Sequence, residues 1–196
     1  MRCWKILMLS ISLSLIGCGT SPQNDDSLIK INSLEEFKNC ILNRTNKTIE
    51  GFELTVDLDF GGAVLNPNGV EKRFIFDGKN HTISNFKILG SENAGLFGKA
   101  YNSTIKNIVF DNVQVTGISP GVLASTVSNS AIENIVVRSN CKIGDGSEGF
   151  SGGVIGFASN DSKITKCINY AEVKGGNSTG GIVGKLYNSG IADCEN

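Results

Sequence analysis

The sequence predicts an all-β fold: a parallel β-helix, or solenoid, of about five coils, with three short strands per coil and a short N-terminal capping helix. Two observations predict it, a motif that recurs along most of the chain and a glycine-bounded apolar segment between its copies. The 196 residues suffice for one domain, and 24 glycines against 3 prolines are typical of a turn-rich β chain. The preference of parallel crossovers favours a right-handed coil.

The recurring motif is Asn-x-x-Ile-x-x-apolar, with Asp in place of Asn in one copy. Its copies are spaced by 22, 27, 32 and 27 residues and begin at Asn80, Asn102, Asn129, Asp161 and Asn188. If each copy occupies one coil, consecutive coils lie about 4.8 Å apart. Two apolar columns then stack inside the solenoid, namely Ile83, Ile105, Ile132, Ile164, Ile191 and Phe86, Ile108, Ile135, Cys167, Cys194.

Glycine-bounded apolar segments separate the copies, and short apolar alternations close most units. The segments are Gly95-Leu96-Phe97-Gly98, Gly121-Val122-Leu123-Ala124, Gly153-Val154-Ile155-Gly156 and Gly181-Ile182-Val183-Gly184. The closing alternations include Val113-Gln114-Val115 and Ala171-Glu172-Val173. The first residues of the motif form a column of Asn and Asp, which we interpret as a ladder of turns because both residues tolerate left-handed backbone.

Residues 31–76 precede the repeats and are predicted to contain the capping helix and the first strands. Ser33 and Glu36 form a capping box, and apolar residues follow at helical spacing, so we expect a helix over Leu34 to Leu42. From Leu54 to Phe60 apolar and polar residues alternate, which indicates a strand with one buried face. The repeats then occupy residues 77–196.

The N-terminus carries export signals. Arg2 and Lys5 precede an apolar run from Ile6 to Ile16 that is too short to cross a bilayer and is typical of a signal peptide over residues 1–17. The segment Leu15-Ile16-Gly17-Cys18 resembles the lipobox of bacterial lipoproteins, which implies lipidation of Cys18; an ordinary signal peptide with a chance cysteine is the alternative. Residues 18–30 then form a lipidated, flexible tether.

The repeats themselves resemble a known family. The glycine-bounded segments, the Asn-x-x-Ile pattern and Cys167-Ile168-Asn169 look like the GLUG repeat of bacterial surface proteins, and the resemblance covers about residues 31–196. It implies a stalk or lateral module of an adhesin-like protein. Some secreted metallopeptidases carry similar repeats, but a chain whose only histidine is His81 has no His-Glu-x-x-His zinc helix. The segment at Gly121 departs from the pattern because Ala124 replaces its closing glycine.

We expect no catalytic residues, no cofactor and no metal site. His81 shares its motif position with serines in the other copies, so we expect it at a solvated turn. Asp57, Asp59 and Asp77 suggest either a calcium site or the acidic cluster of a polysaccharide lyase. Since later coils do not repeat these acids, a solvated face is the favoured interpretation.

Four cysteines remain after Cys3 and Cys18, namely Cys40, Cys141, Cys167 and Cys194. Cys167 and Cys194 occupy one column in consecutive coils, so their separation of about 4.8 Å permits a disulfide. Apolar residues fill the rest of that column, which equally fits stacked buried thiols. Both alternatives stay open from the sequence.

These observations predict an exported, lipid-anchored protein of the cell envelope, held at the outer membrane or cell surface, which acts without catalysis as a binding or spacer module. The alternatives are a carbohydrate-active β-helix enzyme and a truncated remnant of a longer GLUG-repeat protein. The membrane is one partner, through the lipid anchor, and a surface protein or carbohydrate is the expected ligand. A net charge of −1 without a basic stripe argues against nucleic acid. An open edge at Cys194-Glu195-Asn196 invites self-association.

Overall fold

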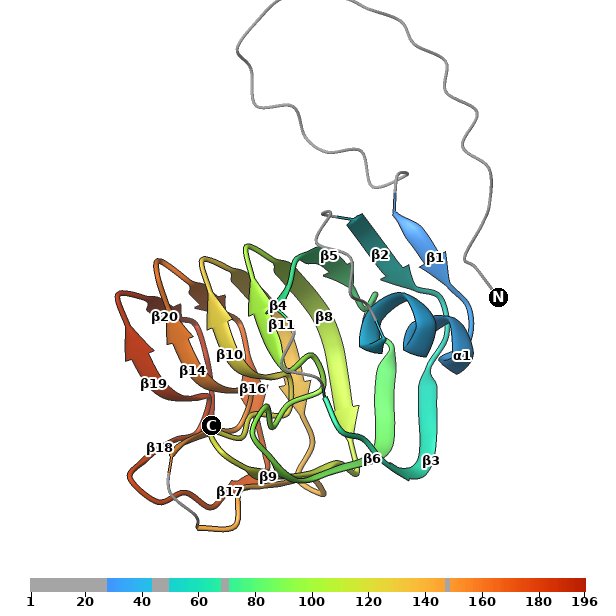
Figure 1. The fold of residues 1–196 in the computed structure, drawn as a ribbon. Coiled ribbons are helices and arrows are strands. Elements are labelled where there is room, and N and C mark those ends of the chain that lie inside the picture. The colour runs from blue at the N-terminus through green and yellow to red at the C-terminus, as the bar shows by residue number, and fades with distance from the viewer. Residues whose placement is uncertain (1–27, 44–49, 68–70, 147–148) are drawn as a thin grey trace, which may run out of the picture.

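The computed structural model describes residues 28–43, 50–67, 71–146 and 149–196, and it is a parallel β-solenoid of about six turns. Its coils run from β1 and the helix α1 at one end to β19 and β20 at the other (Figure 1). Both the all-β class and the parallel coil are confirmed. The predicted signal peptide, Cys18 and nearly all of the predicted tether lie outside the described residues.

Parallel pairing joins equivalent strands of successive coils into ladders. The first ladder contains β1 (Ile29–Ile31), β2 (Glu50–Leu54), β5 (Phe74–Asp77), the start of β8 (Thr104–Asp111), the start of β11 (Ala131–Val137), β15 (Lys163–Thr165) and β20 (Gly190–Ala192). The second ladder contains the starts of β3 (Leu58–Val64) and β6 (Thr82–Ser91), the ends of β8 and β11, and β16 (Ile168–Asn169).

Two more ladders and a short strand pair complete the coil. The third ladder contains the later parts of β3 and β6, β9 (Gln114–Gly117), β12 (Lys142–Ile143) and β17 (Glu172–Val173). The fourth contains β4 (Glu71–Lys72), β7 (Lys99–Tyr101), β10 (Ala124–Ser128), β14 (Ile155–Ser159) and β19 (Val183–Tyr187). The pair is β13 (Phe150–Gly152) with β18 (Ser178–Gly180).

The middle coils have the three strands that the sequence predicts: β7, β8 and β9 form one coil, and β10, β11 and β12 the next. β8 and β11 each belong to two ladders because they bend at Asn107 and Asn134, where φ is 59° and 53°. Asparagine tolerates this left-handed backbone better than most residues with a side chain. The bend turns one long strand around a corner of the solenoid.

The predicted stacking holds from Ile105 onward and is wrong for the first copy. Ile105, Ile132, Ile164 and Ile191 occupy one register of the first ladder. Ile83, however, pairs with Phe110 in the second ladder, and Phe76 lies opposite Ile105 instead. The first motif copy therefore lies one corner further around the coil than its successors.

Apolar side chains fill the solenoid, and a helical turn closes its N-terminal end. α1 (Leu34–Phe37) continues into the π-helical η2 (Lys38–Leu42), which together span the predicted helix. The Ser33 hydroxyl accepts a bond from the Glu36 N–H at 3.2 Å, as a capping residue should. Phe37 is fully buried and packs against Phe60, Phe76 and Phe97. Among the described residues, neither helical segment is long and apolar enough to cross a membrane.

Candidate functional site

Three similar triplets line one corner of the solenoid, between the second and third ladders. They are Asn85-Phe86-Lys87, Asn112-Val113-Gln114 and Asn140-Cys141-Lys142, and the three asparagines lie 27 and 28 residues apart. The middle residue of each triplet is buried in the core, with an exposed fraction of 2% or less. Because alternate residues of a strand point to opposite faces, the flanking amides and lysines point outward.

A chain of hydrogen bonds fixes the asparagines of this corner. The Asn85 amide donates to Asp59 Oδ1 at 2.9 Å, and the Asn112 amide donates to Asn85 Oδ1 at 2.6 Å. The Asn112 backbone N–H donates to Asn140 Oδ1 at 3.2 Å, and the Asn140 amide donates to Asp111 Oδ1 at 2.6 Å. This arrangement holds polar groups at a regular spacing across four coils.

These triplets border a groove of about 450 Å³, which we call the corner groove. Gly61 and Gly62, both with positive φ, form its end nearest the capping helix. Lys87, Gln114 and Lys142 form one outward column, because Lys87 pairs with Gln114 and Gln114 pairs with Lys142. The described residues that line the corner groove include these two lysines and no acid.

A second hollow of about 400 Å³ adjoins the corner groove and shares Asn140 with it. Arg138 lies there beside Asp111, with Nη1 and Oδ2 2.7 Å apart. Tyr170 borders the same hollow and is 62% exposed. The two hollows together present amides, two lysines, the Arg138–Asp111 ion pair and one exposed aromatic ring along the same side of the solenoid.

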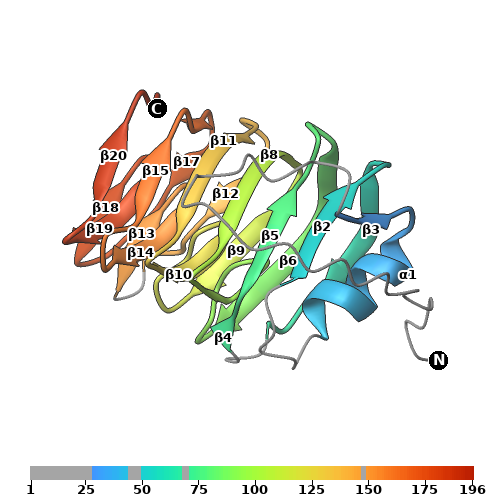
Figure 2. The same cartoon turned by 90° about the horizontal axis from the view of Figure 1, so that it is seen from above.

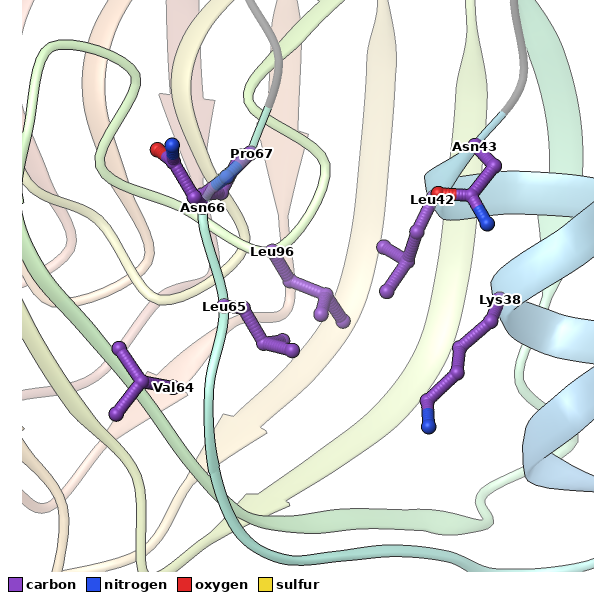
Figure 3. A pocket seen from close by; sticks show the side chains of 8 residues that line it. All are labelled: Lys38, Leu42, Asn43, Val64, Leu65, Asn66, Pro67 and Leu96. Atoms are coloured by element: carbon purple, nitrogen blue, oxygen red, sulfur yellow. The ribbon is translucent and has the colours of Figure 1, made fainter.

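Another pocket, of about 390 Å³, lies between η2 and the chain that follows β3 (Figure 3). Leu42 faces Leu65 and Leu96 across it, and Lys38 lies at its rim, whereas Val64 points away. The chain continues from this pocket into residues 44–49 after Asn43 and 68–70 after Pro67, and both segments lie outside the described residues. The corner groove is therefore the better-defined candidate site.

His81 does not share a column with the serines at the same motif position. The equivalent serines form a buried chain in which the Ser103 N–H donates to Ser130 Oγ and the Ser130 N–H donates to Ser162 Oγ. His81 instead begins the second ladder, and its Nδ1 lies 2.9 Å from Asp57 Oδ1. His81 still lies at a turn, which its N–H closes by donating to the Gly78 carbonyl at 2.8 Å, and its side chain is 30% exposed, as predicted. Only its equivalence to the serines is wrong, because the first motif copy belongs to a different corner.

The three aspartates named from the sequence have separate partners. The Thr82 N–H and the His81 ring lower the pKa of Asp57, and the Gly61 N–H and the Asn85 amide lower that of Asp59. Asp57 and Asp59 are exposed, but the predicted solvated face is wrong for Asp77, which is buried with Lys79 Nζ at 3.5 Å and Lys106 Nζ at 3.3 Å. Within the described part of the chain, no three His, Cys, Asp or Glu residues are grouped closely enough to hold a metal ion.

Cys167 and Cys194 are neighbours in consecutive coils, and the Cys167 N–H donates to Cys194 Sγ at 3.3 Å. Both are free thiols here, as are Cys40 and Cys141. Burial raises the pKa of Cys167 to about 12 and also raises the pKa of Cys141. The disulfide between Cys167 and Cys194 stays a prediction.

No family model matches the chain. Halomucin of Haloquadratum walsbyi is 26% identical over 172 residues, which cover 76% of this chain and 2% of halomucin. Among solved structures, the chain is similar to a Bacteroides ovatus protein whose assignment as an immunoglobulin A1 protease is provisional. That similarity has a TM-score of 0.46 and 17% identity, over 86% of this chain and 76% of the other.

The residues of the corner groove were missed by the sequence analysis, although a signal for them exists. The triplet Asn-apolar-Lys/Gln recurs at nearly the coil length, at Asn85, Asn112 and Asn140. The Asn-x-x-Ile motif is the more regular repeat, and it marks other corners of the same coils.

Proposed function

We propose that this chain is an exported, lipid-anchored surface protein whose solenoid acts as a binding module. The observation that carries the proposal is the corner groove, where outward amides and lysines repeat in register over consecutive coils. The similarity to halomucin, which covers 2% of that protein, supports the surface location. The GLUG-like repeats and the lipobox-like segment support an adhesin-like role and an anchor at Cys18.

Cell capture tests the binding role. Cells that display the full chain are applied to surfaces coated with matrix proteins, mucins or polysaccharides, next to cells that display a variant whose corner groove is disrupted by Gln114→Glu and Asn112→Asp. We expect capture by at least one coating and its loss in the variant. Capture by no coating would contradict the proposal. Turnover of a polysaccharide that is lost in Asp57→Asn would favour the enzyme alternative.

The anchor is tested separately at Cys18. We expect Cys18→Ala to move the protein from the membrane fraction to the soluble fraction, because each buried methylene of an acyl chain contributes about 0.8 kcal/mol to membrane binding. Cys3→Ala, within the predicted signal peptide, is the matched control and should leave the membrane fraction unchanged. An unchanged distribution of the Cys18 variant would contradict the lipid anchor.

A further inference from the structure

We propose that the corner groove binds an anionic polysaccharide, an extended chain that carries carboxylate or sulfate groups and runs across the coils. This inference rests on the proposed surface-binding function and specifies its ligand class. The chain has a net charge of −1, yet the described lining of the corner groove holds Lys87 and Lys142 and no carboxylate. The lining therefore carries two positive charges and attracts an anion, whereas the carboxylates of Asp59 and Asp111 lie beside the lining and accept hydrogen bonds from Asn85 and Asn140.

The two lysines are free to meet a ligand. Both side chains are exposed, and within the described part of the chain neither has an ion-pair partner within 4 Å. This differs from Lys79, Lys106 and Lys166, whose ammonium groups neutralise nearby acids. Lys87 and Lys142 therefore have no acidic partner among the described residues, and their ammonium groups are available to an external anion.

The spacing of the corner groove fits a sugar polymer. Lys87 and Lys142 lie two coil steps apart in one column, so their backbones are separated by about 10 Å. One coil step is close to the length of one pyranose unit. An acidic group on every second sugar therefore reaches the two ammonium groups in turn, with Gln114 facing the sugar between them.

The other polar groups of the corner groove suit the hydroxyl groups of a sugar better than peptide side chains or nucleic-acid bases. Gln114 makes no side-chain hydrogen bond to another described residue, and Asn112 and Asn140 are exposed at the rim. The apolar residues of the lining, Phe86 and Val113, are buried and leave no apolar pocket for a peptide side chain. Beyond Asn140, the exposed ring of Tyr170 offers a face on which a sugar can stack.

The test measures binding of the purified full chain, in mild detergent, to immobilised polymers by biolayer interferometry. Polygalacturonate and chondroitin sulfate supply carboxylate and sulfate, dextran is the neutral polysaccharide, and poly-glutamate is the anionic peptide. We expect binding to at least one acidic polysaccharide, weakened by added salt because exposed charges are screened. In the double variant Lys87→Gln and Lys142→Gln, the affinity for that polysaccharide should fall about five-fold, as expected for the loss of two exposed ion pairs.

The matched control is Lys99→Gln with Lys163→Gln, which removes the same charge from β7 and β15, on other sides of the coil. It should bind as the unmodified chain does. The ligand class would be overturned if poly-glutamate or dextran bound as tightly as the acidic polysaccharides, or if the Lys87 and Lys142 variant kept its affinity. Neither outcome would contradict the proposed surface-binding function. Binding of no polymer overturns this inference, whereas cell capture by a protein coating would still support the surface function.

Discussion

At the scale of single residues, the buried carboxylate of Asp77 shows how the stack accommodates a charge at a corner. Its Oδ1 accepts bonds from the Lys79 N–H at 2.9 Å and the Asn107 amide at 2.8 Å. The ammonium groups of Lys79 and Lys106 lie beside Oδ2. Burial opposes ionisation, but these hydrogen bonds and the charge of Lys106 keep the pKa of Asp77 below its ordinary value. Asp77 therefore links successive coils rather than serving a ligand.

Asp77→Asn should destabilise the protein by about 2 kcal/mol at pH 7, because a buried network loses hydrogen bonds to a charged group. The folded-state pKa is lowered, so this stabilisation is present above the unfolded pKa of about 3.9 and is lost as the pH falls through the folded value. Urea unfolding at pH 7 and pH 3 should show the difference between Asp77→Asn and wild type shrinking at pH 3.

The control for Asp77→Asn is Asp161→Asn, at an exposed turn with positive φ that asparagine also tolerates. It should leave the free energy of unfolding nearly unchanged at both pH values. An equal loss for Asp77→Asn at pH 3 and pH 7 would show that packing, and not the charge, explains the effect.

The cysteines should differ in their reaction with iodoacetamide. Cys141 and Cys167 are buried and have raised pKa values, and at a pKa of about 12 only about one Cys167 in ten thousand is a thiolate at pH 8. Cys40 and Cys194 are only half-buried and should be labelled first in the native protein. Peptide mass spectrometry measures the order. A Cys194 that reacts only after reduction would show the disulfide instead.

At the scale of strands and turns, the sequence predicts the coil well and its corners poorly. The register of the column from Ile105 to Ile191 was predicted correctly: Ile105, Ile132 and Ile164 are fully buried at one position of the coil, whereas Ile191 in the last coil is 42% exposed. Ile83 was misplaced because two different corners use the same turn chemistry: Asn80 and Asn102 both have positive φ and precede a buried isoleucine by three residues. Similar local requirements give similar sequence, so periodicity alone cannot say which corner a copy occupies.

The candidate site was harder to predict than the coil for a related reason. Lys87, Gln114 and Lys142 are not one residue type, and the register that aligns them is set by the strand pairing of the third ladder. An exposed column has no packing requirement that would repeat one residue type. The recurring Asn-apolar-Lys/Gln triplet marks this column in the sequence, but only the register shows that the three side chains line one groove.

The glycines between strands act where the backbones of neighbouring coils meet. A Cβ atom built on Gly153 would lie 2.2 Å from the Gly181 carbonyl oxygen, whereas a Cβ on Gly190 would meet nothing within 4 Å. This close approach explains the glycine-bounded segments that mark each repeat. It also provides a matched pair for experiment.

Gly153→Ala should destabilise the protein by about 1–3 kcal/mol, because the added methyl group forces neighbouring coils apart. Gly190→Ala, in the exposed strand β20, should change the free energy of unfolding by less than about 0.5 kcal/mol. Chemical denaturation of both variants measures the difference. Equal effects would mean that the close approach at Gly153 relaxes at little cost.

At the scale of the whole molecule, the solenoid has a chemically distinct beginning. Phenylalanines concentrate in the first coils and under the helix, where Phe37 packs edge-on against Phe60 and Phe76 with ring centroids 6.1 and 5.9 Å apart. Later coils rely on smaller residues such as Ile132, Val154 and Ala158. Seen from above, the helix covers the end of the stack beside β2 and β3 (Figure 2). The first coil thus gains from the helix the burial that other coils gain from a neighbour.

Loss of the helix packing should therefore loosen the first coils before the whole solenoid unfolds. Phe37→Ala should cost about 3–5 kcal/mol, because a fully buried ring is lost and a cavity remains. Since each coil contacts mainly its neighbours, hydrogen exchange should rise most in β2, β3 and β5 and least in β14 and β15. Leu89→Ala, at a side chain that is 48% exposed, is the control and should leave the exchange pattern unchanged. A uniform rise along the chain would show instead that the coils unfold as one unit.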